Sequence, residues 1–312
     1  MTDTSRLVTL LNERGASRVA LQFPAGLKRQ AGEIAGTLRA AGFFVVISGD
    51  PCYGACDLAL DTLSFADVLV HFGHTPLGTH PDVIFLPWEV DIPLESLDHA
   101  IPLLRESLVG LVTTSQHAHQ LPRVAEYLGD RGIEARIGEV SERTPLPGQI
   151  LGCSYSAARV PGVKEILYIG TGVFHPLGVQ LATGARVVAL DPFTGTSAVI
   201  DASRLLRTRH ALIERARRAD RFGILVSTKT GQCRRELAER LAGLCDRAFL
   251  VVAREIDPGE LLNLGFGAYV NTACPRLSYD DQVRFPVPVL TPQEFEILCG
   301  VRQWEDYAID EV

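Results

Sequence analysis

Short apolar runs alternate with longer stretches of helical spacing along the first hundred residues. Four of these runs are predicted strands, at residues 18–23, 43–47, 67–72 and 83–86. Between the first two strands, apolar side chains recur at helical spacing, at Leu27, Ala31, Ile34, Ala35 and Leu38. Gly42 follows them, so a helix is predicted to end before this glycine. Strands that alternate with helices favour a parallel sheet with right-handed crossovers and both faces covered.

The same order of runs occurs twice more. Strands are predicted at 108–113, 135–140, 165–169 and 186–190, and again at 222–226, 249–252, 268–270 and 288–290. Two segments also match locally, because HFGHTPLG (71–78) and YIGTGVFHPLG (168–178) both follow an apolar run and both end in Pro-Leu-Gly. We therefore predict an α/β fold of three related domains, each a small parallel sheet flanked by helices, arranged with pseudo-threefold symmetry, at residues 1–100, 101–200 and 201–312.

Bulk composition is ordinary for a soluble globular chain, with 46% hydrophobic and 21% charged residues. The formal charge is 30 − 37 = −7, so we expect no direct binding to nucleic acid or to an anionic membrane. No apolar run reaches the roughly 18 residues of a membrane helix. The N-terminus lacks the basic start and apolar core of an export signal, and its Leu7, Leu10 and Leu11 suit the buried face of a short helix. A cytoplasmic location is therefore expected.

An arginine-rich segment follows the second set of strands. It carries seven arginines, Arg204, Arg207, Arg209, Arg215, Arg217, Arg218 and Arg221. Apolar residues at helical spacing predict a helix that joins the second and third domains, with the arginines on a solvated face. A docking surface for a large partner or its bound RNA is the alternative.

Seven scattered cysteines are an odd number, which argues against a disulfide framework. Cys52 and Cys56 are four residues apart, but no second close pair completes a zinc motif. Position is more informative than spacing. Cys56 follows a predicted strand, Cys153 precedes a predicted helix, and Cys274 ends a strand. Ligands of open parallel sheets bind beyond the carboxyl ends of strands, so each predicted domain offers one thiol where a site would form.

Five motifs together resemble the archaeal diphthamide-synthesis family: GDPCYGACDLA (49–59), the glycine-rich stretch 170–175, LDPF (190–193), STKTGQCRREL (227–237) and NTACPRLSYDD (271–281). They spread over nearly the whole chain, and the ACPRLS block is the most specific. The resemblance implies three similar α/β domains that each give one cysteine, here Cys56, Cys153 and Cys274, to one 4Fe–4S cluster. It also implies that the iron without a protein ligand binds S-adenosylmethionine.

The family's reaction is the first step of diphthamide formation. The resemblance implies transfer of the 3-amino-3-carboxypropyl group of S-adenosylmethionine to a histidine of translation elongation factor 2, with release of methylthioadenosine. It further implies a homodimer and a separate electron donor. A quinolinate-synthase-like iron–sulfur dehydratase and a non-catalytic partner subunit are the alternatives.

Contacts to S-adenosylmethionine are expected on turns after strands, where backbone N–H groups are free to bind carboxylate or ribose oxygens. The candidates are Gln22, Gly26, Gly170, Gly172, His175, Asp191, Gln232 and Arg276. Each could equally be a turn, a helix cap or a salt-bridge residue.

Cys52 could be an alternate ligand, a repair thiol or a loop residue, whereas Cys233, Cys245 and Cys299 are expected as buried thiols in helices. Metal ligation by His71, His74, His117 and His119 is not expected, because no cysteine or carboxylate pattern completes a site with them.

Overall fold

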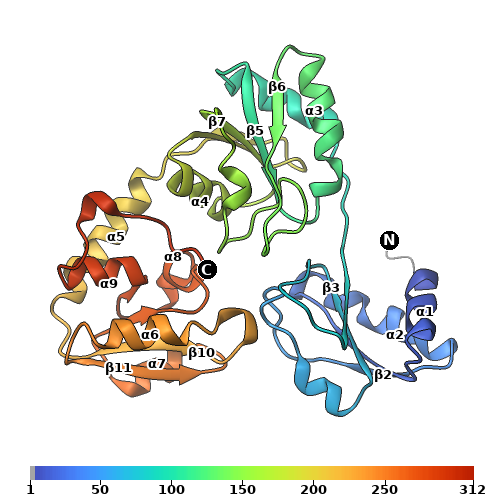
Figure 1. Cartoon of the computed structure of the whole chain (residues 1–312), viewed down its shortest axis with the longest axis horizontal. Coiled ribbons are helices and arrows are strands. Elements are labelled where there is room, and N and C mark those ends of the chain that lie inside the picture. The colour runs from blue at the N-terminus through green and yellow to red at the C-terminus, as the bar shows by residue number, and fades with distance from the viewer. Residues whose placement is uncertain (1–3) are drawn as a thin grey trace.

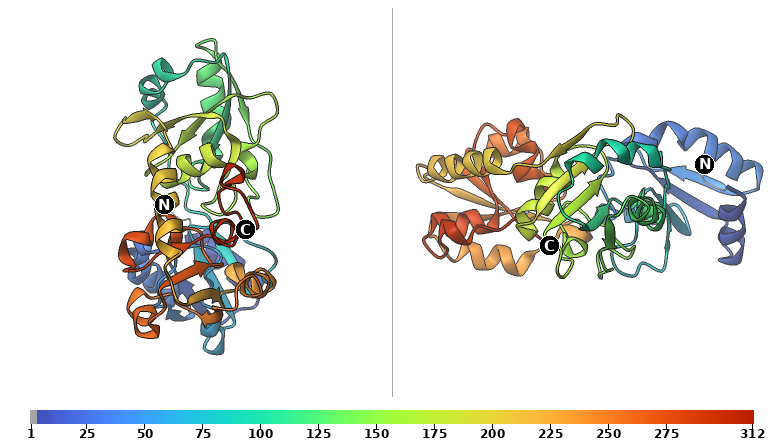
Figure 2. Two further views of the ribbon diagram at one scale, coloured as in Figure 1. Left: turned by 90° about the vertical axis from the view of Figure 1, so that its left-hand side faces the viewer. Right: turned by 90° about the horizontal axis from the view of Figure 1, so that it is seen from above.

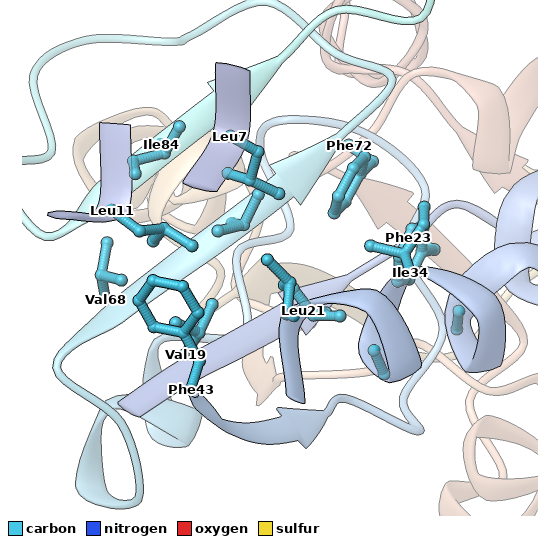
Figure 3. Packing of buried hydrophobic residues seen from close by; sticks show 14 residues of the cluster. Leu7, Leu11, Val19, Leu21, Phe23, Ile34, Phe43, Val68, Phe72 and Ile84 are labelled. Carbon is cyan, nitrogen blue, oxygen red and sulfur yellow. The ribbon is translucent and has the colours of Figure 1, made fainter. Parts of the chain in front are cut away.

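The computed structural model describes residues 4–312, which form three lobes around a common centre (Figure 1). The first lobe holds a fully parallel sheet in the order β2-β1-β3-β4. Its strands and helices are α1 (Thr4–Glu13), β1 (Arg18–Gln22), α2 (Ala31–Ala40), β2 (Phe44–Ile47), β3 (Val68–Phe72) and β4 (Val83–Leu86). Leu7 and Leu11 of α1 and Ile34 of α2 pack with the apolar residues of the strands (Figure 3). Leu10 is only half-buried.

The second lobe holds five strands in the order β6-β5-β7-β8-β9. Its elements are β5 (Leu108–Thr113), α3 (Leu121–Gly129), β6 (Glu134–Ile137), β7 (Glu165–Ile169), α4 (Phe174–Thr183), β8 (Arg186–Leu190) and β9 (Ser197–Val199). The sequence did not predict β9, which pairs with β8 in antiparallel fashion. The connection between them is too short for the crossover that a parallel pair needs. The helix predicted after Cys153 is only a single 3-10 turn, Ser156–Ala158.

The third lobe repeats the arrangement of the first, in the order β11-β10-β12-β13. Its elements are α5 (Ser203–Ala216), β10 (Phe222–Ser227), α6 (Arg235–Ala242), β11 (Ala248–Ala253), α7 (Pro258–Leu264), β12 (Ala268–Asn271), α8 (Arg276–Tyr279), β13 (Val289–Leu290) and α9 (Pro292–Leu298). The predicted fold class is confirmed as three mostly parallel sheets flanked by helices. The domain limits at residues 100 and 200 stay predictions.

Helix α5 follows the second lobe in the chain and packs against α9 in the third lobe (Figure 1). The prediction that its arginines form a solvated face was wrong for Arg209, which is 1% exposed. Its guanidinium bonds both carboxylate oxygens of Glu294, at 2.7 and 2.5 Å. Glu294 in turn closes a capping box with Thr291 at the start of α9. This ion pair therefore fixes α5 against α9, while the other six arginines are exposed.

The C-terminal tail ties the third lobe to the second, and its end lies near the centre of the molecule (Figures 1 and 2). Ile309 packs in a core cluster of the second lobe. Asp310 forms a 2.6 Å ion pair with Arg234 of the third lobe. The N–H of Val312 donates to the carbonyl of Cys153 across 2.8 Å. The tail thus sets the position of the Cys153 loop relative to the third sheet.

No helix within residues 4–312 is long and apolar enough to cross a membrane.

Candidate metal centre

Cys56, Cys153 and Cys274 line a single cavity of about 380 Å³, here called the cysteine cavity. Each comes from a different sheet, since Cys56 lies on the loop after β2, Cys153 on the loop between β6 and β7, and Cys274 just after β12. The cavity is completed by segments that follow β3, β5 and β7, at residues 73–75, 114–116 and 171. The carboxyl ends of strands from three sheets therefore meet there, as expected for a site of parallel sheets.

Cys56 contacts the third lobe directly. Nε2 of Gln232 donates a hydrogen bond to its Sγ across 3.2 Å. A Cβ at Gly231 would stand 2.5 Å from the Cβ of Cys56, so only glycine lets the two backbones approach this closely. Burial raises the pKa of the Cys56 thiol; the Gln232 hydrogen bond opposes this shift, and the nearby Cys153 adds to it.

Cys153 has a cationic neighbour. Nη2 of Arg143 lies 3.7 Å from its Sγ and also donates to the carbonyl of Gly231 across 3.3 Å. Burial raises the pKa of Cys153, and the charge of Arg143 opposes this shift. Nε of Arg143 is buried and has no hydrogen-bond partner among the described residues. A buried N–H without an acceptor is costly, so this atom marks a place for an additional acceptor.

Cys274 is held by the turn that follows β12. Nδ2 of Asn271 donates to the carbonyl of Cys274 at 2.8 Å, and Oδ1 of Asn271 accepts from the N–H of Ala273 at 2.9 Å. Burial raises the pKa of this thiol to about 12, and the Cys56 and Cys153 thiols act in the same direction. Neighbouring thiols thus raise the pKa of both Cys56 and Cys274, and binding to a metal removes this conflict because it replaces the thiol protons.

The donor set fits an iron–sulfur cluster. Three cysteine sulfurs converge, two N–H donors already contact them, and the unpartnered Nε–H of Arg143 lies beside them. Hydrogen bonds from N–H groups to sulfur are one of the ways in which proteins set cluster potentials. Cys56, Cys153 and Cys274 would hold such a cluster, and three ligands would leave one iron open to another molecule.

Cys52 belongs to a different group of side chains. Its sulfur and one ring nitrogen each of His71 and His74 lie within 4.8 Å of one another. The sequence argument that no cysteine completes a site with these histidines was therefore wrong for His71 and His74. Burial raises the pKa of Cys52 to about 12. His117 instead bonds the carbonyl of Val90, and His119 pairs with Asp91.

Three of the eight predicted cofactor contacts line cavities at the cysteines. His175 lines the cysteine cavity, and Gln232 lines a second cavity of about 380 Å³ that also reaches Cys56 and Cys274. Arg276 lines both, although its guanidinium also pairs with Asp280 at 2.9 Å. The second cavity, here called the charged cavity, carries side chains of both signs, Lys229, Arg254, Glu255, Asp257, Asp281 and Arg284.

The other five candidates lie outside these two linings. Gln22 is fully buried behind the Cys56 loop, and Gly26 is exposed on a 3-10 turn. Asp191 closes its own turn by accepting from the N–H groups of Phe193 and Thr194. Gly170 and Gly172 adopt positive φ on the turn between β7 and α4, which accounts for glycine at both positions.

Sequence reasoning missed Arg143, Gly231, the C-terminal tail and the segment after β5. The last had a usable signal, because Thr114, Ser115 and Gln116 directly follow an apolar run at the carboxyl end of a strand. The expectation that Cys233, Cys245 and Cys299 lie within helices was also wrong. Cys233 is exposed just before α6, and Cys245 and Cys299 are half-buried beyond the ends of α6 and α9.

Comparison with known proteins decides the family. Residues 23–308 match the family model described as putative diphthamide synthesis protein. The chain belongs to the diphthamide synthesis family. It is 40% identical to the 2-(3-amino-3-carboxypropyl)histidine synthase of Pyrococcus horikoshii, over 99% of this chain and 92% of that one. Subunit 1 of the human enzyme of the same name is 32% identical, over 96% and 72% of the two chains.

A solved structure agrees with this family assignment. The crystal structure of Dph2 from Pyrococcus horikoshii with a 4Fe–4S cluster superposes with a TM-score of 0.95 at 39% identity, covering 100% of this chain and 94% of that one. The chain is thus a transferase of the diphthamide synthesis family, and its structural neighbour carries the kind of cluster that the three cysteines fit.

Proposed function

We propose that the chain carries out the first step of diphthamide formation. A 4Fe–4S cluster on Cys56, Cys153 and Cys274 opens a carbon–sulfur bond of S-adenosylmethionine, and the 3-amino-3-carboxypropyl group passes to a histidine of translation elongation factor 2, releasing methylthioadenosine. The observation that carries this proposal is the convergence of one thiol from each sheet on one cavity. It is supported by the cluster in the related structure and by the name of the Pyrococcus enzyme.

The cavities suggest how the substrates are held. The charged cavity presents cations and carboxylates beside Cys56 and Cys274, which suits the zwitterionic end of S-adenosylmethionine. Gln232 and Arg276 are the contacts we retain there. Apart from Arg276, the polar side chains of the cysteine cavity are neutral and include His74 and His175, which suits the acceptor imidazole. A homodimer, an electron donor and a cytosolic setting complete the proposal on the family resemblance.

An activity assay under anaerobic conditions tests this proposal. The reconstituted protein is reduced with dithionite, given S-adenosylmethionine and the elongation factor, and assayed for methylthioadenosine by chromatography and for added mass on the acceptor histidine. We expect both products from the wild type and from Cys245→Ala, whose half-buried thiol lies outside the site, and neither from Cys153→Ala. A full cluster that never cleaves S-adenosylmethionine would contradict the proposal and favour the dehydratase. Cleavage only beside a second protein would favour the partner subunit.

A further inference from the structure

A chain of hydrogen bonds leads from the carboxyl end of β1 to the cysteine cavity, through Gln22, His71 and His74. Gln22 is buried at the end of β1. Its Nε2 donates to the carbonyl of Asp57 at 2.7 Å, and its Oε1 accepts from the N–H of Ala59 at 3.1 Å. A carbonyl only accepts and an N–H only donates, so these two backbone groups settle the orientation of the amide.

That orientation fixes the protons on both histidines. Nδ1 of His71 lies 2.8 Å from Oε1 of Gln22, and an amide oxygen only accepts, so this nitrogen carries the hydrogen. Nε2 of the neutral ring therefore has a lone pair. It lies 2.9 Å from Nδ1 of His74, which must then be the donor. The remaining nitrogen, Nε2 of His74, is left with a lone pair, and His74 lines the cysteine cavity.

Burial keeps both rings neutral, because it lowers the pKa of His71 to about 3 and that of His74 to about 4. The carboxylate of Asp57 favours a proton on His74. Burial also lowers the pKa of His175, the other histidine of the cavity, to about 4, and the charge of Arg276 adds to this shift. His175 differs from His74 because, within residues 4–312, no hydrogen bond orients its ring.

The proposed reaction releases one proton at the acceptor. The product name of the Pyrococcus enzyme places the new group on carbon 2 of the imidazole. The bond from the sulfonium sulfur to the transferred carbon breaks, a carbon–carbon bond forms, and carbon 2 loses its hydrogen as a proton. That proton carries away the positive charge of the sulfonium. If one electron is used to break the sulfonium bond, it is returned when carbon 2 loses its proton, so the reaction needs no net oxidant.

We propose that Nε2 of His74 is the base that accepts this proton, and that Gln22 and His71 are positioning residues that keep it unprotonated. This inference rests on the proposed function and adds a catalytic residue to it. A histidine held in one tautomer by a hydrogen bond at its other nitrogen is a common arrangement for a base. Positioned bases contribute about 10²–10⁴-fold to proton transfer.

The test separates proton removal from bond cleavage. In His74→Ala we expect methylthioadenosine release close to that of the wild type, with about 100-fold less modified acceptor. Deuterium on carbon 2 of the acceptor histidine should slow transfer more in this variant than in the wild type.

The matched control is His119→Ala, because His119 does not line the cysteine cavity and pairs with Asp91 instead. Equal loss of both products would mean a structural role and overturn the inference, as would unchanged transfer. Absence of methylthioadenosine from the wild type would instead refute the proposed function.

A second readout does not depend on turnover. Nitrogen NMR of the ¹⁵N-histidine-labelled holoenzyme should show hydrogen on Nδ1 and none on Nε2 for His74, with the signals identified by their loss in His74→Ala. A hydrogen on Nε2 would overturn the inference. Stoichiometric zinc bound through Cys52, His71 and His74 would do the same, because the metal would occupy the ring lone pairs.

Discussion

Nε2 of Gln232, on the turn after β10, donates a hydrogen bond to Sγ of Cys56, on the loop after β2, across 3.2 Å. This contact joins the third sheet to the first at the candidate metal centre. Arg143 makes the corresponding link between the Cys153 loop and Gly231, the neighbour of Gln232. The three cysteines are thus held at one point by contacts between loops of different sheets, so cluster binding and lobe assembly should depend on each other.

Replacement of Gly231 tests the close approach of two loops. A Cβ there would lie 2.6 Å from the Cα of Cys56, so Gly231→Ala must push the loops apart, and we expect a cost of about 1–3 kcal/mol. Iron content after reconstitution should fall well below that of the wild type. Gly36→Ala, on an exposed face of α2 with open space around it, should leave iron content unchanged. Full iron loading of Gly231→Ala would contradict this account.

Arg143 should raise the reduction potential of the cluster. It brings a positive charge and N–H donors to Cys153, and both favour the more negative, reduced state. Arg143→Met should therefore shift the midpoint to more negative values in an anaerobic redox titration followed by electron paramagnetic resonance. Arg159→Met removes an arginine that pairs with Glu311 rather than with the thiol, and should leave the midpoint in place. An equal shift in both variants would refute a specific effect of Arg143.

The buried ion pair between α5 and α9 should be a large stability determinant. Arg209→Met leaves the buried carboxylate of Glu294 without its partner, which costs about 3–5 kcal/mol in free energy of unfolding. Arg217→Met, at the C-terminal cap of the same helix, removes an exposed pair with Glu214 and an exposed hydrogen bond to the carbonyl of Leu298, and should cost about 1 kcal/mol or less. Urea titrations measure both values. Similar costs for the two variants would show that burial of Arg209 has no special energetic effect.

His71 should make the protein sensitive to acid. Its pKa in the folded state, about 3, lies below the ordinary value of 6.5. The unfolded chain therefore binds more protons between these values, so stability is present above about pH 6.5 and is lost as the pH falls. Between pH 7 and 5 this amounts to roughly 2 kcal/mol for one histidine. Urea midpoints at the two pH values should differ less for His71→Asn than for the wild type, and an equal difference would exclude His71 as the cause.

The sequence predicted the central strands well because β3, β5, β7, β10 and β12 are compact apolar runs that are buried along nearly their whole length. The GDPCYGACDLA and NTACPRLSYDD blocks singled out Cys56 and Cys274 through the family, and the family's one cysteine per domain implied Cys153, whereas spacing alone did not. Arg209 was misplaced because its partner, Glu294, lies 85 residues away, and no local pattern marks an arginine that finds a buried carboxylate. The Gln22–His71–His74 chain was missed for the same reason, since hydrogen bonds between strands and loops depend on tertiary structure.

The central claim is that Cys56, Cys153 and Cys274 together hold one cluster, and iron analysis of single variants tests it most directly. After anaerobic reconstitution and desalting, the wild type should carry four irons per chain, as in the 4Fe–4S cluster of the related structure. Cys56→Ala, Cys153→Ala and Cys274→Ala should each lose most of this iron, whereas Cys52→Ala and Cys245→Ala should keep it. Retention of the full cluster without Cys274, or its loss without Cys52, would contradict the account.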